Sequence, residues 1–433
     1  MSLSQAAVPL GVLAHHATVR VDRKGRIDRI RVHIWPRMAK QLQFRSMTNR
    51  LSVAIVGAGI GGLAAAATLL RAGADVQVYE QAGGFARVGA GIQMTPNAMK
   101  VLGGLGLEER LRRVAFAPRS ALNREWDSGE VSNELQIGDA MEARYSAPYL
   151  LMHRADLHGA VASLVPSEMV HLQRKVIGLD QDGRSATIAF ADGGLARADA
   201  VIAADGVHSA VRELLLGPES PEFSGRVAYR TTFPTALLRG ADLPPSKTKW
   251  WGPDRHIVMY YVTANRSELY FVTSQPEDAR WMTPESWSAK GDLSQLRDAY
   301  AGFHPQVQAV LAACPEVHKW ALLTRAPLPR WTQGRVALLG DACHPMTPYM
   351  AQGAATSLED AVVLARCLEG IDSEGVPQAL ERYEAVRKPR TSAIQLTSKT
   401  NTWMRRQTNP DWVYGYDAWT VPLTAPAAES TVQ

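Results

Sequence analysis

The stretch Leu-Ser-Val-Ala-Ile-Val-Gly-Ala-Gly-Ile-Gly-Gly-Leu at residues 51–63 decides the fold of this chain. Its apolar, β-branched first half predicts a buried strand, and an alanine-rich segment over residues 63–72 predicts a helix behind the glycines. Gly57 permits a tight turn, Gly59 lets backbone N–H groups approach a pyrophosphate, and Gly62 lets the helix pack close to the strand. The positive end of the helix dipole then faces the phosphates.

A second strand follows this helix and ends in an acidic residue. It spans residues 75–79, and Glu80 stands 23 residues after Gly57. A carboxylate at this position is placed to accept hydrogen bonds from the ribose of a dinucleotide. A G-x-G-x-x-G motif is weak evidence by itself, but two strands, a helix and the terminal acid together predict a Rossmann-like unit. The motif does not distinguish NAD from FAD.

Two later buried strands also end in aspartate. Residues 199–206 read Asp-Ala-Val-Ile-Ala-Ala-Asp-Gly, and residues 335–342 read Arg-Val-Ala-Leu-Leu-Gly-Asp-Ala. A carboxylate at a strand end, as at Asp205 and Asp341, is placed to accept hydrogen bonds from a sugar-alcohol chain. For Asp205, the residues alone favour a turn-forming or helix-capping role.

The order of these three motifs resembles the group A flavoprotein aromatic hydroxylases, relatives of 4-hydroxybenzoate and salicylate hydroxylases. The resemblance implies an α/β fold, in which a Rossmann-like FAD-binding domain carries an inserted antiparallel-sheet substrate domain, as in the 4-hydroxybenzoate hydroxylase-like fold. It implies FAD as the cofactor, O2 as a co-substrate, and NADH or NADPH as a transient co-substrate that leaves after hydride transfer.

The same resemblance assigns residues that bind the flavin. Asp205 would lie near the pyrophosphate and the nicotinamide approach, and Asp341 would hold the ribityl chain. Arg154, in an Arg-x-x-Leu motif, would approach the phosphates. Backbone N–H groups at Gly353 and Ala354 would lie near the pyrimidine edge of the flavin and the O2 site.

Five further motifs narrow the resemblance. They are Lys-Trp-Trp at 249–251, Asp-Arg-His at 254–256, Asp-Ala-Cys-His-Pro-Met at 341–346, Met-Ala-Gln-Gly-Ala at 350–354 and Trp-Val-Tyr-Gly-Tyr-Asp at 412–417. Together they are similar to the 6-hydroxynicotinate 3-monooxygenase branch, which uses NADH and O2 to replace the ring carboxyl of 6-hydroxynicotinate with hydroxyl. This implies a product, 2,5-dihydroxypyridine, and release of CO2. The alternatives are a salicylate-type or 6-hydroxypicolinate-type hydroxylase and, in another class, a non-catalytic FAD-binding regulator.

A strand over residues 256–262 supplies two candidate catalytic residues. Its period of two places His256 and Tyr260 on one face. A base or hydrogen-bond acceptor that deprotonates a ring hydroxyl raises the electron density of the ring for oxygen transfer, and His and Tyr can form such a relay. Both positions match active-site residues of the relatives, whereas the residues alone also allow a surface His and an interfacial Tyr.

The expected pocket departs from that of the relatives at several positions, so the identity of the substrate stays open. Gln93 takes the place of an active-site His, as in salicylate hydroxylases, and a neutral amide donates hydrogen bonds but is no acid or base. Lys247 takes the place of a pocket Cys and can pair with a substrate carboxylate. Thr347 and Tyr349 stand where the relatives have Lys and His. We expect Gln93 to contact the substrate beside His256 and Tyr260, with Lys247, Pro348 and Tyr349 completing the substrate site.

Domain boundaries follow from the pattern of elements. The middle of the chain alternates strands at residues 227–233, 256–263 and 268–274, and a helix is expected over 293–303. Amphipathic helices are expected over 358–368 and 377–387. We assign the FAD-binding domain to residues 48–120, 150–220 and 326–400, the substrate domain to 121–149 and 221–325, and a C-terminal helix and tail, loose from about 425, to 401–433.

Charge along the chain argues against a nucleic-acid partner. Residues 1–50 contain ten Lys/Arg and two Asp/Glu, whereas the remainder contains 37 and 40. The main body is therefore not basic. Residues 1–47 form a basic N-terminal extension, and we favour a translation start at Met47 over a role of this extension in binding.

Composition points to a cytoplasmic protein. Hydrophobic residues make up 46% and charged residues 21%, as in ordinary globular chains. The apolar run at 51–70 is interrupted by glycines, so no membrane span is expected. The three cysteines, at positions 314, 343 and 367, form neither a disulfide framework nor a metal-binding pair, so no metal is expected. The sequence does not reveal the oligomeric state.

Overall fold

The computed structural model describes residues 17–21, 27–32, 50–85, 90–241, 243–278 and 289–424. The chain divides into two compact units, Met1–Arg50 and Leu51–Gln433. In the first, β1 (Ala17–Val21) pairs antiparallel with β2 (Ile27–Val32). The rest of the N-terminal extension, including the expected start at Met47, and the tail from 425 lie outside the described residues.

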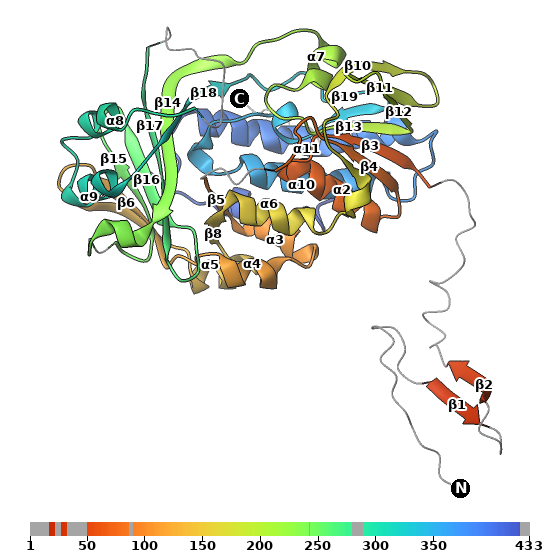
Figure 1. Cartoon of the computed structure of the whole chain (residues 1–433), viewed down its shortest axis with the longest axis horizontal. Helices are drawn as coiled ribbons and strands as arrows, with labels where there is room; N and C mark the ends of the chain where they lie inside the picture. The colour runs from red at the N-terminus through yellow and green to blue at the C-terminus, as the bar shows by residue number, and fades with distance from the viewer. Residues whose placement is uncertain are drawn as a thin grey trace, which may run out of the picture. The chain divides into compact units, whose positions relative to one another are not determined.

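The second unit contains a mostly parallel sheet whose strand order is β19-β20-β13-β3-β4-β9, and only β19 runs antiparallel (Figure 1). The three strands that the sequence singled out, β3, β13 and β20, are neighbours. Their carboxyl ends therefore meet at one edge, where α/β sheets bind ligands. The bounds are β3 (Ser52–Val56), β4 (Asp75–Tyr79), β9 (Val170–His171), β13 (Ala200–Ala203), β19 (Thr332–Gln333) and β20 (Val336–Leu338).

A second sheet has the order β18-β14-β17-β16-β15-β6-β7. Its strands pair antiparallel, as expected, except that β15 and β6 are parallel. These two strands come from distant segments, so no hairpin forces them to be antiparallel. The bounds are β6 (Ser120–Glu125), β7 (Val131–Gln136), β14 (Glu222–Pro234), β15 (Lys247–Trp251), β16 (His256–Tyr261), β17 (Glu268–Pro276) and β18 (His318–Thr324).

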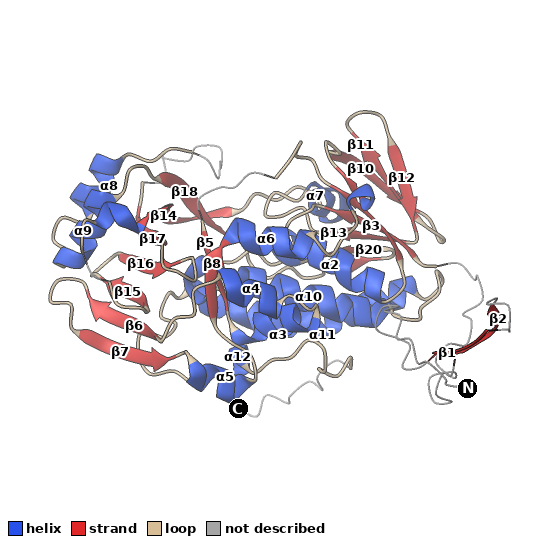
Figure 2. Ribbon diagram, turned by 60° about the horizontal axis from the view of Figure 1, so that its bottom comes forward, coloured by secondary structure: helices blue, strands red, loops and turns tan. Residues whose placement is uncertain are grey.

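A layer of helices lies between the two sheets in both Figures 1 and 2. Small residues on α2 (Ile60–Arg71) let α10 (Gly353–Leu368) pack closely, and Thr68 Oγ1 donates a 3.0 Å hydrogen bond to the carbonyl of Ala361. The other helices are α3 (Pro96–Gly104), α4 (Glu108–Val114), α5 (Asp139–Tyr145), α6 (Arg154–Ala162), α7 (Ala210–Leu216), α8 (Leu293–Ala299), α9 (Pro305–Ala313), α11 (Val376–Lys399) and α12 (Asp411–Tyr414).

Two smaller sheets complete the unit. One is the antiparallel pair β5 (Gly91–Met94) and β8 (Leu150–His153), and the other has three strands, β10 (Val176–Gln181), β11 (Ala186–Phe190) and β12 (Leu195–Ala198). The β5–β8 pair carries Gln93 opposite Leu151, between the two main sheets.

Two helix predictions had wrong ends. The helix expected over 293–303 stops at Ala299, and Pro305 begins α9, because proline suits the first turn of a helix. The helix expected over 377–387 continues through Pro389 to Lys399. Among the described residues, no helix has both the length and the apolar character needed to cross a membrane.

Candidate functional site

The glycine-rich turn after β3 closes tightly on the neighbouring strand. Gly57 has a φ of +101°, and a Cβ there would lie 2.4 Å from the carbonyl oxygen of Ala204. A Cβ on Gly62 would lie 2.0 Å from the carbonyl oxygen of Gly57. A Cβ on Gly59, in contrast, would meet no atom of the described residues within 4 Å. Two glycines therefore allow the packing, and the third leaves space in front of the turn.

That space lies at the N-terminus of α2. Gly59, the N-cap residue, has no side chain to cap the helix, and Gly59, Ile60 and Gly61 line a cavity of about 350 Å³. Unpaired N–H groups at a helix N-terminus favour an anion such as a phosphate. Glu80 fixes the turn, since its carboxylate accepts hydrogen bonds from the N–H groups of Ala58 and Ala82, each at 2.8 Å.

Arg154 and Asp341 face this large cavity from opposite elements. Arg154 begins α6, and Asp341 follows β20. Burial raises the pKa of the Asp341 carboxyl, although the positive charge of the Arg154 guanidinium acts to lower it. Gly353 and Ala354, at the start of α10, also line the cavity. Together with Gly59, five of the predicted flavin-binding residues thus line one space.

Asp205 is placed differently. Its neighbours Ala204 and Gly206 line the large cavity, but its own carboxylate accepts a hydrogen bond from the N–H of Val211, at 3.2 Å, in the first turn of α7. Among the described residues, its second oxygen, Oδ1, is buried without a hydrogen-bond partner, and burial raises the pKa of this carboxyl. The carboxylate thus contacts the first turn of α7, whose N-cap residue is Ser209, and Asp205 is not among the described residues that line the large cavity.

A smaller cavity of about 70 Å³ adjoins the large one. Four residues line both cavities, namely Gln93, Val272, Pro348 and Ala351. The smaller cavity is enclosed by the second sheet, by β5 and by a segment after α11. A molecule in the small cavity would therefore share a wall with one in the large cavity.

A hydrogen-bonded group surrounds Gln93 at this shared wall. The hydroxyl of Tyr149 donates to Gln93 Oε1 at 2.6 Å, and Lys247 Nζ lies 3.4 Å from the same oxygen and 3.3 Å from the Tyr149 hydroxyl. Burial raises the pKa of Tyr260 well above its ordinary value, and a hydrogen bond from Gln93 opposes the shift. The structure thus brings together Gln93, Tyr260 and Lys247, and adds Tyr149, which the sequence gave no reason to single out.

His256 contacts other partners. Its ring packs against Trp251 and Tyr349, with centroids 5.4 and 5.5 Å apart, and Nδ1 lies 3.4 Å from Asn401 Nδ2. Burial, with Lys249 and then Arg226 nearby, holds the pKa of His256 well below its ordinary value, so the ring is neutral at neutral pH.

The predicted pair His256 and Tyr260 therefore belongs to two neighbouring spaces. Both lie on β16, and four residues of strand separate their Cα atoms by about 13 Å. His256 lines the small cavity, whereas Tyr260 lines the large one and packs on Tyr270 with a centroid distance of 5.0 Å. A proton passing between them needs groups in between, such as the substrate itself.

The C-terminal segment, residues 400–414, forms one wall of the small cavity through Trp403, Met404 and Tyr414. Asn123 Nδ2 and Asn133 Nδ2 both donate to the carbonyl oxygen of Met404 at 3.0 Å, which fixes the segment to the second sheet. The sequence placed this segment in the tail, because no local pattern connects it with a strand nearly 280 residues earlier.

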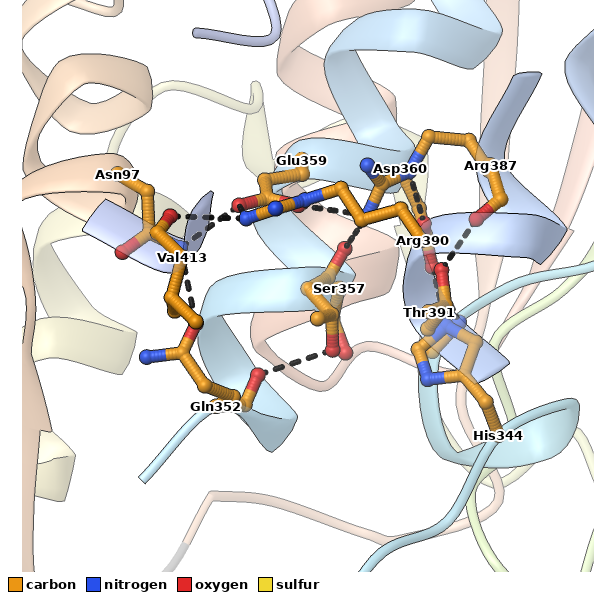
Figure 3. Close-up of polar contacts among 12 residues, drawn as sticks. Asn97, His344, Gln352, Ser357, Glu359, Asp360, Arg387, Arg390, Thr391 and Val413 are labelled. Atoms are coloured by element: carbon orange, nitrogen blue, oxygen red, sulfur yellow. Dashed lines mark hydrogen bonds and ion pairs between the residues drawn. The ribbon is translucent and has the colours of Figure 1, made fainter. Parts of the chain in front are cut away.

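A buried ionic network lies beneath the loop between β20 and α10. Asp360 accepts hydrogen bonds from His344 Nε2 at 2.5 Å and from Arg387 Nε at 2.7 Å, and Arg387 also pairs with Glu359 at 2.7 Å (Figure 3). Burial alone would raise the pKa of Asp360, but His344 and Arg387 hold it below its ordinary value.

The network extends to the loop that borders the large cavity. Asn97 Nδ2 donates to Glu359 at 2.7 Å and to Gln352 Oε1 at 2.9 Å (Figure 3). Arg390 pairs with Glu359 at 3.0 Å and donates to the carbonyl of Val413 at 2.9 Å. The network therefore ties the start of α10 to the C-terminal segment.

The large cavity fits FAD. The open space at Gly59 and the uncapped α2 N-terminus suit a pyrophosphate, Arg154 supplies a positive charge, and Asp341 supplies oxygens for hydroxyl groups. Glu80 fixes the turn after β3 but is not among the described residues that line this cavity.

Comparisons with known proteins agree with this fit. Residues 50–398 match the family model described as FAD binding domain. The chain is 44% identical over 377 residues to a 6-hydroxynicotinate 3-monooxygenase of Bordetella bronchiseptica, covering 87% of this chain and 98% of the relative. It is 33% identical over 373 residues to a salicylate hydroxylase of Pseudomonas putida, covering 80% and 84%.

Solved structures show the same fold. A Klebsiella pneumoniae HpxO complexed with FAD and uric acid matches with a TM-score of 0.73 at 28% identity, covering 84% of this chain and 90% of that one. A salicylate hydroxylase substrate complex matches with a TM-score of 0.74 at 25% identity, covering 88% and 99%. This chain thus belongs to the FAD-binding-domain family and is a flavin-dependent aromatic monooxygenase.

Proposed function

We propose that this monooxygenase hydroxylates a hydroxylated aromatic or pyridine carboxylate with NAD(P)H and O2, and that 6-hydroxynicotinate is converted to 2,5-dihydroxypyridine with loss of CO2. The observation that carries the proposal is the small cavity beside the FAD cavity. Two lysines line it, and none of its described lining residues is acidic. An enclosed positive site of this kind favours a small organic acid.

The residues around the large cavity would hold the cofactor. In this proposal the α2 N-terminus with Gly57, Gly59 and Gly62 binds the pyrophosphate, Arg154 approaches the phosphates, and Glu80 and Asp341 bind the ribose and ribityl hydroxyls. Gly353 and Ala354 present the N-terminus of α10 to the flavin. FAD, when bound, accepts electrons from NAD(P)H and delivers one oxygen atom of O2 to the ring.

The residues at the shared wall would orient and activate the substrate. Gln93 accepts from Tyr149 and Lys247, so its NH2 group remains to donate to Tyr260 or to a ring substituent. Tyr260 would bind the ring hydroxyl at the large cavity, and the neutral His256, about 13 Å away along β16, would take up the proton only through groups that lie between them. Loss of that proton makes the ring more electron-rich at the carbon that receives oxygen.

Gln93 favours one second candidate, a salicylate-type hydroxylase. The residue is a neutral amide whose oxygen is already engaged, so it cannot exchange a proton with the substrate. A substrate whose hydroxyl and carboxylate are adjacent needs no ionisable partner at this position. The Tyr349 hydroxyl, bonded to Ser274 Oγ at 2.9 Å, likewise offers no charge.

Product mass spectrometry tests the proposal. Purified, FAD-loaded protein is given NADH, 18O2 and 6-hydroxynicotinate, with salicylate and 6-hydroxypicolinate in parallel. A product from 6-hydroxynicotinate that has gained one labelled oxygen and lost CO2 is expected. NADH oxidation that yields only peroxide would exclude 6-hydroxynicotinate and direct attention to the other two acids. Ligand-independent NADH oxidation, with no product from any acid, would contradict the proposed substrate class.

A further inference from the structure

Lys249 is a buried lysine that the sequence did not mark as a site residue. It lies on β15 two residues after Lys247, so both side chains emerge on the same face of the sheet. Lys249 is 9% exposed and lines the small cavity. A lysine is rarely buried to this extent unless it is paired with a negative charge.

The described partners of Lys249 carry no negative charge. Its Nζ donates to Asn401 Oδ1 at 3.3 Å. It lies 3.6 Å from the ring centroid of Trp251 and 5.8 Å from that of Tyr349. Aromatic faces and one long amide hydrogen bond compensate a buried ammonium only in part.

The nearest charged groups add to the positive potential. Burial, together with Lys247, Arg405 and Arg226, lowers the pKa of Lys249 well below its ordinary value. The guanidinium carbon of Arg405 lies 5.1 Å from the centroid of the Trp251 ring, the same ring that Lys249 contacts. The nearby carboxylate of Asp254 is bonded to Arg255 at 2.8 Å and lies outside the cavity lining.

Lys247 is held differently, although it lies on the same face. Its Nζ contacts Gln93 and Tyr149 at the wall shared with the large cavity. Lys249 instead contacts residues of the C-terminal segment and the His256 side of the cavity. The two lysines therefore address opposite ends of the same small space.

We infer that Lys249 binds an anionic substituent of the substrate in the small cavity and is thereby a specificity-determining residue. The inference rests on the proposed function, because it assumes that a ring acid occupies this cavity. The anion is a ring carboxylate or an ionised ring hydroxyl, and both offer the negatively charged oxygen that an ammonium group binds. A bound anion would favour the charged form of Lys249, and Asn401, His256 and Trp251 would then position the ammonium group.

Ligand titrations of the FAD-loaded protein, followed by the flavin absorbance spectrum, test the inference. The probes are 6-hydroxynicotinate, 6-hydroxynicotinamide, nicotinate and nicotinamide, which differ pairwise in one substituent. The variants are Lys249→Met, which removes the charge, Lys249→Arg, which retains it, and Lys175→Met, an exposed lysine on the flavin side, as the matched control. FAD content and melting temperature show that each variant is folded.

The wild-type protein and Lys175→Met are expected to bind 6-hydroxynicotinate about 10- to 100-fold more tightly than its amide, and Lys249→Met to lose this preference. Lys249→Arg should restore part of it, which a merely structural role would not predict. If Lys249→Met instead binds 6-hydroxynicotinate no more tightly than nicotinate while it still prefers each acid to its amide, the substituent that Lys249 binds is the ionised ring hydroxyl.

Two outcomes count against the inference, and they are distinguishable. Unchanged ligand preferences in Lys249→Met, with tight binding by the wild type, would overturn the role of Lys249 and leave the proposed function standing. Failure of the wild type to bind any of the four probes would overturn 6-hydroxynicotinate as the proposed substrate, and with it the inference that Lys249 binds an anionic substituent of that ring. If Lys249→Met retains no FAD, Lys249→Gln replaces it in the same comparison.

Discussion

Tyr149 donates its hydroxyl hydrogen to Gln93 Oε1 across 2.6 Å, and this bond fixes the orientation of the Gln93 amide between the two cavities that Gln93 lines. Because the amide oxygen is engaged by Tyr149 and Lys247, the NH2 group is the part of this side chain that remains to donate a hydrogen bond. A residue that cannot ionise thus becomes an oriented hydrogen-bond donor at the wall shared by the two cavities.

Replacement of Tyr149 by Phe should release this orientation. The lost hydrogen bond corresponds to about 0.5–1.5 kcal/mol, so we expect a roughly 2- to 10-fold lower affinity for the substrate. We also expect more peroxide formed for each NADH consumed, because a loosely held ring receives oxygen less often. The ratio of hydroxylated product to NADH checks this, and an unchanged ratio would show that the bond is not needed for orientation.

Replacement of Tyr260 by Phe separates catalysis from cofactor binding. The hydroxyl is the proposed partner of the ring hydroxyl, whereas the phenyl ring keeps its packing on Tyr270 and against Gly91. The hydroxylation rate should fall by about 100-fold or more, with the affinity for FAD nearly unchanged. Single-turnover kinetics and a flavin titration measure the two quantities, and equal losses in both would sink the assignment.

Binding of a ring acid should weaken as the pH rises through about 8. Burial lowers the pKa of Lys247 to about 8, so its ammonium is charged below that pH and neutral above it. The carboxylate of nicotinate stays ionised throughout this range. Nicotinate affinity is measured from pH 6.5 to 9.5 in the wild type, in Lys247→Met and in the exposed-lysine control Lys175→Met. A transition near pH 8 that persists in Lys247→Met would assign it to another group.

Alanine at Gly62 should lower the stability of the apoprotein, whereas alanine at Gly59 should lower the affinity for FAD. A Cβ on Gly62 would lie 2.0 Å from the carbonyl of Gly57, so Gly62→Ala should lower the melting temperature of the apoprotein. Within the part of the chain that the structure describes, a Cβ on Gly59 meets no atom within 4 Å, so Gly59→Ala should leave that temperature unchanged and weaken FAD binding at least about tenfold. Equal melting temperatures of the two apoproteins would contradict the geometry.

Removal of Arg387 should destabilise the protein far more than removal of a surface arginine. Arg387→Met leaves the buried carboxylates of Glu359 and Asp360 without a shared cation, at a cost of about 3–5 kcal/mol in the free energy of unfolding. The control is Arg113→Met, which breaks an exposed pair with Glu109 and should cost less than about 1 kcal/mol. Denaturant unfolding of both FAD-loaded variants measures the difference, and similar costs would show that water reaches the network.

The flavin half of the fold was predictable because its signals are local. The strand, glycine turn, helix and terminal acid around Gly57 fall within 30 residues, and two more strand ends carried aspartates to the same edge. The strands of the second sheet were visible from their alternation, but the parallel pairing of β15 with β6 was not, because it joins distant segments. The position of Asp205 shows the limit of a motif, since its spacing did not reveal which way its carboxylate points.

The small cavity was predictable only in part. Gln93, Lys247 and His256 were found through resemblance to known sequences. Lys249 could have been found from the period of two that it shares with Lys247, whereas Tyr149 and Asn401 gave no signal. Their roles depend on long-range packing, in which a loop before β8 and the residues after α11 converge on one strand.

The C-terminal segment contributes to the small cavity from outside the part of the chain that matches the family model. The family match ends at residue 398, yet Trp403, Met404 and Tyr414 beyond it form a wall of the small cavity. None of the described residues that line the large cavity belongs to this segment, so substitutions within residues 400–414 would reshape the small cavity and leave the lining of the large cavity unchanged.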